Sequence, residues 1–247
     1  AGSFAEYEVP KRNNVDDPKF TSIFAGALWM GGTDVNGQLK IAAVTFRANG
    51  NDFWPGPLNK TTAEVTADEC AVFDQFWGIS VAEVAEFVAH YECKKDPNCD
   101  AASSYPGYKI PDVIREWPAR GNVVQKGGTG NTYTITQELA PFYDRGLDGI
   151  YDPDDGDYPK YAITDAQKKI NCRATRDIRL FGDTTIWFVF NDKGNTHTEA
   201  SGPSIGMEIR GQAFAFATND EVNNMTFYNY QMINRSTFTL TNTYFGQ

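Results

Sequence analysis

The chain has 247 residues and a formal net charge of −10, from 32 Asp and Glu against 22 Lys and Arg. Nucleic acids and anionic membrane surfaces repel such a chain, so we expect no nucleic-acid partner. The sequence has no run of about 18 apolar residues, the length that crosses a bilayer, and we expect no membrane insertion. The length allows a substantial core, and we expect a single β-rich domain over residues 1–247.

A β-hairpin is predicted between residues 22 and 47. Two apolar runs flank Asp34-Val35-Asn36-Gly37, and an Asn-Gly pair readily supplies the positive backbone angles of a tight turn. Trp54 follows in a turn rich in Pro and Gly, residues 51–57. A rigid, exposed turn would present its indole for stacking on a sugar or a protein, which makes Trp54 a candidate surface-binding residue. Core packing is the alternative.

A helical insertion is predicted over residues 61–120, where the apolar period changes from two to about 3.6. Thr66 with Glu69, and Ser80 with Glu83, match the capping box that begins a helix. A third short helix is expected to open at Pro111.

Four cysteines, Cys70, Cys93, Cys99 and Cys172, form an even set without a CxxC pair, which argues against zinc and thioredoxin-type chemistry. We predict two disulfides, Cys93–Cys99 across a short turn and Cys70–Cys172 across a long loop. Disulfides persist in oxidising compartments, so this pattern favours an exported protein. The alternative is four reduced thiols in a cytosolic protein.

Residues 144–157 contain six aspartates in fourteen positions. With Asp144 as position 1 of a calcium loop, Asp148 falls at position 5, Gly149 at the sharp turn of position 6, Asp152 at position 9 and Asp155 at position 12. Carboxylates so close together repel one another, and a hard cation would relieve that repulsion. The spacing predicts calcium held by the four aspartates Asp144, Asp148, Asp152 and Asp155.

Two departures weaken the match. Gly146 occupies position 3, where a side-chain oxygen is usual, and position 12 carries Asp in place of a bidentate Glu. Prolines on both sides of the loop argue against flanking helices, so we expect a structural staple on the surface. The alternative is a solvated acidic turn without metal.

Strands are predicted again over 184–190, 205–218, 225–233 and 237–245, the last two as a hairpin around residues 234–236. Mainly β strands with a helical insertion indicate an α+β fold, arranged as a β-sandwich or jelly-roll-like domain. The chain opens at Ala1 without Met and stops at Gln247 directly after an expected strand. We therefore expect the N-terminal part of a longer polypeptide.

Signals for catalysis are weak. Residues 202–206 match GxSxG, but no buried strand precedes the serine and no helical pattern follows it, so we interpret them as an ordinary loop. Residues 126–131 share only glycine content with a phosphate loop. His90 and His197 are the only histidines, which argues against catalytic zinc. We predict no catalytic residues, although paired carboxylates for glycoside hydrolysis stay open among so many acids.

Five collinear stretches together resemble a family of large exported proteins of Bacteroidota that carry a C-terminal sorting domain for type IX (type nine) secretion. They are residues 22–37, 50–57, 148–159, 187–194 and 233–236. The resemblance implies an outer-surface or released protein that passes through an outer-membrane translocon and is associated with adhesion or gliding motility. It supplies no catalytic residues.

We expect an extracellular or cell-surface structural or adhesive module, an adhesin-like piece stabilised by calcium. Its partners would be type IX translocon components during export, and a surface glycan or protein afterwards. One alternative is a secreted carbohydrate-active enzyme or carbohydrate-binding domain, which as an enzyme requires two carboxylates across an aromatic-lined groove. Another is a passenger cargo bound to its secretion translocon.

Overall fold

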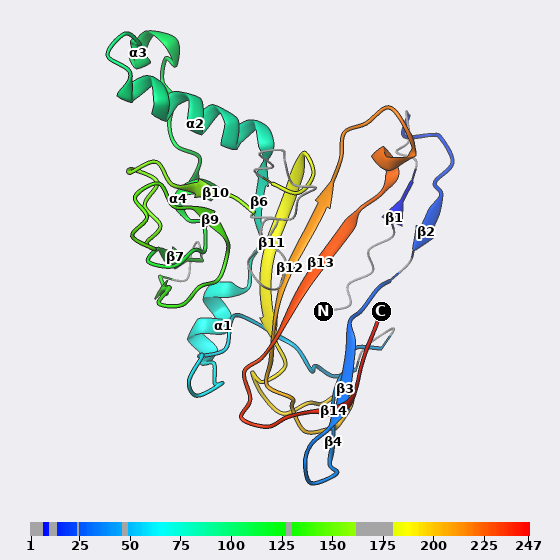
Figure 1. The fold of residues 1–247 in the computed structure, drawn as a ribbon. Coiled ribbons are helices and arrows are strands. Elements are labelled where there is room, and N and C mark those ends of the chain that lie inside the picture. Colours follow the sequence, from blue (N-terminus) through cyan, green and yellow to red (C-terminus); the bar gives the residue numbers. More distant parts are fainter. Residues whose placement is uncertain (1–6, 10–13, 24, 46–48, 127–129, 162–179) are drawn as a thin grey trace. The chain divides into compact units, whose positions relative to one another are not determined.

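The computed structural model describes every residue except 1–6, 10–13, 24, 46–48, 127–129 and 162–179. Strand accounts for 29% and helix for 16%, which confirms the mainly β, α+β class. The chain divides into two compact units, described separately below (Figure 1). Unit 1 comprises Ala1–Asp74, Val189–Arg210 and Tyr230–Gln247, and unit 2 comprises Gln75–Phe188 and Gly211–Asn229. The single domain and the sandwich or jelly-roll arrangement of the sheets stay predictions.

The described elements follow this division. Strands within unit 1 are β1 (Tyr7–Glu8), β2 (Thr21–Ile23), β3 (Trp29–Thr33), β4 (Leu39–Ala42), β5 (Trp54–Pro55) and β14 (Thr241–Gly246). Strands within unit 2 are β6 (Trp77–Ser80), β7 (Val123–Gln125), β8 (Thr132–Thr134), β9 (Phe142–Tyr143) and β10 (Tyr158–Pro159). Strands that run through both units are β11 (Thr184–Asn191), β12 (Met207–Ala215) and β13 (Phe227–Asn234). Helices are α1 (Ala67–Phe73) in unit 1 and α2 (Val81–Lys95), α3 (Ala101–Ser104), α4 (Asp112–Arg115) and the 3-10 helix η1 (Glu221–Asn224) in unit 2.

The strands form two larger sheets and three two-stranded ones. The first sheet has the order β13-β12-β11-β5, and the second has the order β14-β3-β4. Strand β6 pairs with the first half of β11, from Thr184 to Trp187, whereas β5 pairs with its end at Phe190 and Asn191. The two-stranded sheets join β1 to β2, β7 to β8 and β9 to β10. Each residue pairing recorded for these strands is antiparallel.

The hairpin predicted between residues 22 and 47 is confirmed. Strands β3 and β4 pair antiparallel from Met30 with Ala42 to Thr33 with Leu39. Gly37 has φ of 79°, in the left-handed region that glycine tolerates without strain. The preceding Asp34 carboxylate accepts the backbone N–H groups of residues 36 and 38 and so closes the turn.

The hairpin predicted around residues 234–236 is wrong. Strand β13 pairs with β12, whereas β14 pairs with β3, so the two consecutive strands belong to different sheets. The connection explains the difference. Arg235 donates its backbone N–H to the Gly206 carbonyl oxygen, and Leu240 packs against a buried cluster that includes Met30, which draws the chain away from β13 before β14 begins.

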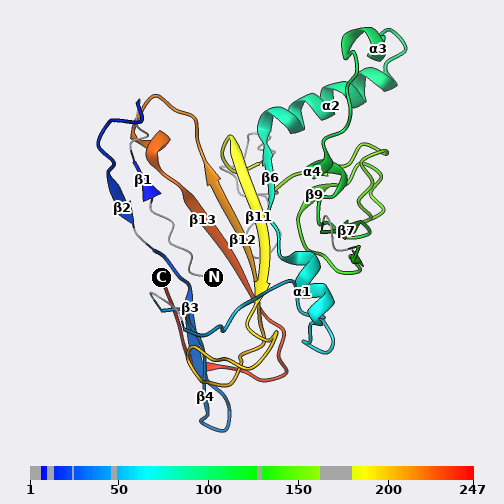
Figure 2. The same cartoon turned by 180° about the vertical axis from the view of Figure 1, so that it is seen from behind.

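Helices lie inside the predicted insertion, as expected. Both capping boxes are present: Thr66 and Glu69 begin α1, and Ser80 and Glu83 begin α2. Helix α4 follows Pro111, which confirms the third short helix. Strand β6, between α1 and α2, and helix α3, at the far end of α2 in Figures 1 and 2, were not predicted. No helix among the described residues is both long and apolar enough to cross a membrane.

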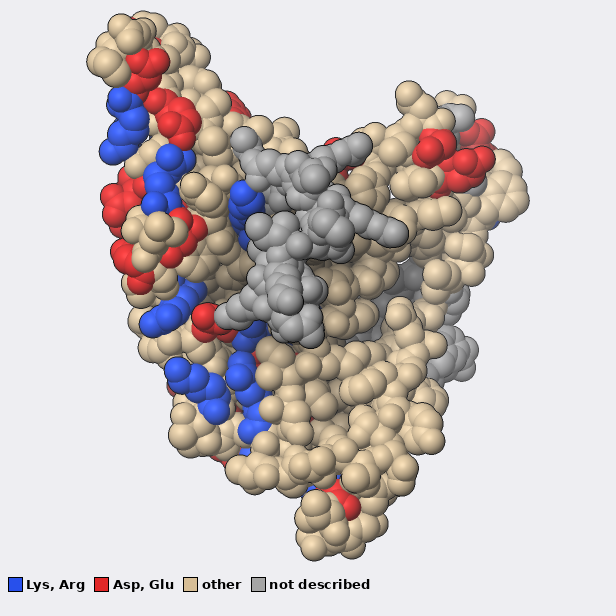
Figure 3. Space-filling view, viewed as in Figure 1, with Lys and Arg blue, Asp and Glu red and all other residues tan. Residues whose placement is uncertain are grey.

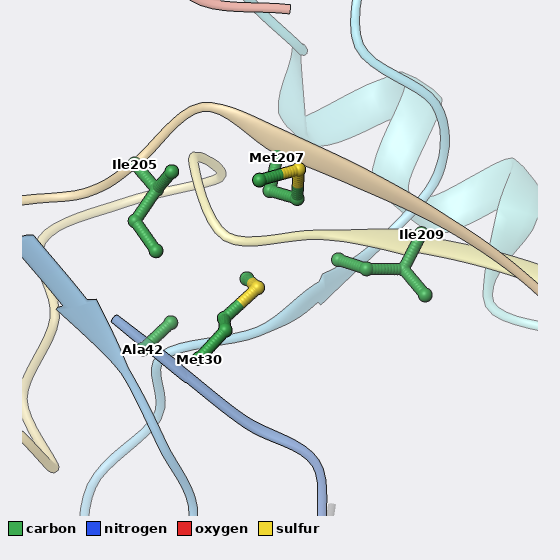
Figure 4. Close-up of a cluster of buried hydrophobic side chains, with 5 residues drawn as sticks. All are labelled: Met30, Ala42, Ile205, Met207 and Ile209. Atoms are coloured by element: carbon green, nitrogen blue, oxygen red, sulfur yellow. The ribbon is translucent and has the colours of Figure 1, made fainter. Parts of the chain in front are cut away.

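The core of unit 1 includes a cluster between β3, β4, the start of β12 and the residue Ile205 before it. The side chains of Met30 and Ile205 point toward one another in Figure 4, with Ala42, Met207 and Ile209 around them. All five are at most 5% exposed. Removing this apolar surface from water stabilises unit 1.

The core of unit 2 is built around tryptophans. The ring centroids of Trp77 and Trp187 lie 5.7 Å apart and those of Trp117 and Trp187 lie 6.4 Å apart. The indole of Trp77 donates to the Glu116 carbonyl oxygen at 2.8 Å and that of Trp117 to the Pro141 carbonyl oxygen at 3.0 Å. Buried indoles usually find such partners, and here they join the helical region to β6 and β11 within unit 2.

Candidate functional site

The acidic loop, residues 144–157, lies in unit 2 between β9 and β10. Asp144 organises its first turn, because its carboxylate accepts the backbone N–H of Asp148 at 3.3 Å and that of Gly149 at 2.7 Å. Gly149 has φ of 76°, as the sharp turn at the predicted position 6 requires. The turn expected of the first half of a calcium loop is therefore present.

The other predicted ligands are engaged differently. Asp148 accepts the backbone N–H of Ile150 at 2.8 Å, and Asp152 accepts that of Asp154 at 2.8 Å. Each carboxylate therefore closes a local turn of the kind that short acidic side chains commonly form. Asp155 is exposed on the surface of the loop.

Asp157 is the buried carboxylate of the loop, at 2% exposure. It accepts the backbone N–H of Arg145 at 2.8 Å and that of Asp152 at 2.9 Å, and so closes the loop on itself. Burial raises the pKa of Asp157; the two hydrogen bonds lower it, and the charges of Asp144 and Asp148 raise it further. Sequence spacing did not single out Asp157, because its role depends on burial.

The loop is also anchored to the helical part of unit 2. The Arg145 guanidinium forms an ion pair with Glu92 at 2.7 Å and lies 4.7 Å from the ring centroid of Tyr91. Tyr151 is buried and donates its hydroxyl to the Ile114 carbonyl oxygen at 2.6 Å. Burial raises the pKa of Tyr151 well above its usual value, with Asp157 adding to the effect, so this hydroxyl keeps its proton at neutral pH.

The fit of the loop to a metal ion is incomplete. Among the described residues, which include all of 144–157, no three His, Cys, Asp or Glu side chains are gathered to hold a metal ion. Asp144, Asp148, Asp152 and Asp155 are therefore not assembled as one ligand set. The Asp144 and Asp148 carboxylates are near enough to raise the pKa of Asp157, yet the loop is held by its own hydrogen bonds. Calcium stays a prediction.

Cys93 and Cys99 form a disulfide with a Cα–Cα separation of 5.2 Å, which confirms the predicted short bridge. It ties the last turn of α2 to the residues that lead into α3. Cys70 is half-buried in α1, and burial raises the pKa of its thiol. Its predicted partner, Cys172, lies outside the described residues.

Trp54 is half-buried, not presented on an exposed turn. Its ring centroid lies 5.8 Å from that of the buried His197, and its indole also covers Gly194, where an added Cβ would overlap the ring. The packing of Trp54 therefore matches the core alternative more closely than the surface role.

Residues 202–206 form an irregular segment that leads directly into β12, so the GxSxG serine has no helix after it. This confirms the interpretation as a loop. Residues 127–129, in the middle of the segment that resembles a phosphate loop, lie outside the described residues. The structure therefore adds no support for either motif.

Two aromatic side chains that the sequence analysis did not single out share one face of the β14-β3-β4 sheet. Tyr244 pairs with Gly31, and Trp29 pairs with Gly246, so the two aromatic side chains project from the same face, with a glycine opposite each. Tyr244 is 76% exposed and Trp29 is 51% exposed. The Trp29 indole donates to the Val44 carbonyl oxygen at 2.8 Å, which fixes its orientation. We call Trp29, Gly31, Tyr244 and Gly246 the aromatic face.

An open pocket of about 480 Å³ also lies in unit 1. Its lining is mostly hydroxyl, amide and apolar: Met207, Asn234, Ser236, Thr237, Phe238, Thr239, Leu240 and Thr243. It has no carboxylate in its lining, so it does not present the pair that glycoside hydrolysis requires.

Charges are distributed unevenly over the surface. In Figure 3, acidic and basic side chains alternate along the region that carries α2 and α3, while the visible face of unit 1 is mostly uncharged. Interspersed charges give no extended field of one sign on the face in view.

No protein-family model, curated protein or solved structure matches the chain.

Proposed function

We propose that the chain is a structural or adhesive module of an exported cell-surface protein of the type IX secretion class. The aromatic face is the observation that carries this proposal. Exposed Trp and Tyr side chains contribute much of the binding energy where proteins meet partners, because they bury large areas at a small entropic cost. A fixed indole, an exposed phenol and two glycines that leave the sheet open suit a flat contact surface.

The export part of the proposal is supported by the Cys93–Cys99 disulfide. Such bridges persist outside the reducing cytosol. The resemblance of five collinear stretches to type IX cargo proteins supports the same location. Translocon components would be partners during export, and copurification with them would favour the reading as passenger cargo.

Calcium stabilisation of the acidic loop is part of the proposal. The turn around Asp144 and the repulsion of Asp157 by the Asp144 and Asp148 charges support it, because crowded carboxylates gain from a cation. The present arrangement of the four predicted ligands does not support calcium binding, because they are not gathered as one ligand set. Cation binding would require Asp148, Asp152 and Asp155 to turn inward.

The second candidate function is carbohydrate binding without hydrolysis. The pocket of unit 1 favours it, because Ser, Thr and Asn side chains beside Phe238 can bond and stack on a neutral sugar. This candidate and the protein-adhesion proposal differ in the ligand, so one experiment can separate them.

The test compares binding of the wild type with that of the paired Trp29→Ala and Tyr244→Ala variant, on a glycan array and on intact cells of its own source. We expect cell binding to fall at least tenfold in the variant, while Phe20→Ala, at an exposed position of unit 1 outside the aromatic face, binds as wild type. Array binding that survives the paired change would favour the pocket as a sugar site. Unchanged cell binding would remove the aromatic face from adhesion.

A further inference from the structure

Strand β14 forms one edge of the β14-β3-β4 sheet, and among the described residues its backbone pairs only with β3. The opposite edge, at β4, is covered. The backbone N–H of Ile41 donates to the Pro203 carbonyl oxygen at 3.3 Å, and the Ile41 carbonyl oxygen lies 2.7 Å from Nδ1 of His197. The sheet therefore has one covered edge and one edge that the described part of the chain leaves open.

The pairing pattern identifies the backbone groups that face the open edge. In an antiparallel sheet a residue directs its N–H and its C=O to the same side, and this side alternates along the strand. Ile41 directs both groups away from β3, so its pairing partner Gly31 directs both toward Tyr244. The next residue of β14, Phe245, therefore directs its N–H and C=O away from β3.

An extended backbone is the ligand that matches this edge, because its own C=O and N–H groups complement those of Phe245. Edge strands of natural proteins often carry a charge or a proline that prevents such pairing. Residues 241–246 carry neither. A bulge between Thr241 and Tyr244 interrupts the first part of the strand, so the regular part of the open edge is Tyr244–Gly246.

The side chains beside Phe245 fit a second copy of the chain. Two antiparallel β14 strands related by a two-fold axis at Phe245 place Tyr244 opposite Gly246 of the second copy. Beyond that glycine lies Trp29 of the second copy, because Trp29 and Gly246 pair within each sheet. Tyr244 then has a glycine opposite it on both sides, Gly31 within its own chain and Gly246 of the second copy.

Exposure and charge favour the same occupant. Tyr244 is 76% exposed, Trp29 is 51% exposed and Phe245 is 50% exposed, so pairing of two copies would remove much aromatic surface from water. Each chain has a net charge of −10, but the uncharged β14 brings no like charges together at the contact. The strand is therefore a place where two acidic molecules can meet.

We propose that two copies of this chain associate through β14, so that their β14-β3-β4 sheets join into one continuous sheet. This inference rests on the proposed adhesive function, because it names a second copy as the partner of the aromatic face. Copies on neighbouring cells would then bind one another. The regular edge is short, so a single contact is weak and adhesion depends on many copies acting together.

Phe245→Pro tests the backbone pairing directly, since proline has no N–H to donate. The N–H that it removes faces the open edge, where edge strands tolerate proline, so the fold is retained. Phe245→Ala keeps the N–H and is the matched control. We expect the dimer dissociation constant of Phe245→Pro to be at least about tenfold higher than that of the control, because two hydrogen bonds are lost.

Analytical ultracentrifugation over a concentration series measures these constants. Equal dissociation constants for the two variants would overturn the proposal. So would a wild type that stays monomeric at every concentration.

Phe245→Cys provides a readout that does not depend on proline. Directly opposite residues of an antiparallel pair have Cα atoms about 4.5–5.5 Å apart, within the range of a disulfide. Mild oxidation should therefore link two copies of this variant. Leu39→Cys is the control, because Leu39 is 59% exposed but lies on β4, at the covered edge. Neither this control nor the wild type, which contains Cys70, should be linked, and equal linking of both variants would contradict the pairing.

The result can be separated from that of the adhesion test. Suppose that the paired Trp29→Ala and Tyr244→Ala variant loses cell binding while the wild type stays monomeric. This outcome would overturn the inference and leave adhesion to a different partner. A dimer that forms through β14, with cell binding unchanged in that variant, would support the pairing and remove the aromatic face from adhesion.

Discussion

Arg235 holds the buried carboxylate of Glu208 with two nitrogens. Its Nε lies 3.2 Å from one carboxylate oxygen and its Nη2 lies 3.1 Å from the other. Arg210 donates to the same group at 2.8 Å, and so does the backbone N–H of Leu58 at 3.0 Å. Glu208 is 0% exposed, so all its hydrogen bonds are made inside unit 1.

Replacing Glu208 with Gln should lower the free energy of unfolding by about 3–5 kcal/mol, because Arg235 and Arg210 would lose their buried counter-charge. Urea unfolding of the wild type and the variant measures this loss of free energy. Glu64→Gln is the matched control, since Glu64 pairs with Lys193 near the surface, where such pairs contribute at most about 1 kcal/mol. Equal losses in the two variants would contradict the central role of Glu208.

Calcium should raise the melting temperature relative to chelator, because a ligand that binds only the native state stabilises it. At one hundred times the dissociation constant the gain is about 2.7 kcal/mol. Asp148→Ala should lose this gain and behave nearly as wild type in chelator. Asp154→Ala, at an exposed position outside the predicted ligand set, should keep it. Identical melting of the wild type with and without calcium would reduce residues 144–157 to an acidic turn.

The stability of the acidic loop should depend on pH through Asp157. Its native pKa is raised by burial, so the protonated form favours folding below about pH 4, and this contribution is lost as the pH rises through the native value. In chelator, the wild type should therefore lose stability relative to Asp157→Asn between pH 4 and neutrality.

Only the pH dependence of that difference is informative, because the amide of Asn offers one acceptor where the carboxylate accepts two backbone N–H groups. Burial also raises the pKa of Asp192, but this effect is the same in both proteins and cancels. A difference that stays constant with pH would show that Asp157 has an ordinary native pKa.

The free energy of unfolding of the paired Cys93→Ser and Cys99→Ser variant should be about 2 kcal/mol lower than that of the wild type. This is the contribution expected of a disulfide that closes a short loop. Alkylation of the denatured, unreduced wild type should label no cysteine. Two labels, on Cys70 and Cys172, would remove the long bridge, and four would remove the argument for export.

Local signals predicted local structure well. Thr66 with Glu69, Ser80 with Glu83, and Asn36 with Gly37 specify caps and a turn through contacts within a few residues, and each is present. Strand pairing was harder to predict from the sequence. The partner of β14 is β3, more than two hundred residues away, and no pattern near residue 235 distinguishes that sheet from a hairpin.

In the candidate sites, too, the features set by local spacing were predicted and those set by distant contacts were not. Spacing identified Asp144 and the turn at Gly149, but it could not identify Asp157, whose role depends on burial. Likewise, Trp54 looked exposed beside Pro and Gly, whereas Trp29 sat within an apolar run. Their relative exposure depends on which chain segments cover them, and those segments lie far away in sequence.

The pairing of β3 with β14 also sets the order in which unit 1 can be completed during biosynthesis. Thr241 bonds to Thr33 across a sequence separation of 208 residues. At roughly 5–20 residues per second, a ribosome delivers β14 about 10–40 s after β3. During that interval β3 has β4 beside it but one edge unpaired, near the half-exposed Trp29. A strand edge left open for this long can pair with a strand of another chain, so unit 1 is exposed to aggregation until β14 arrives.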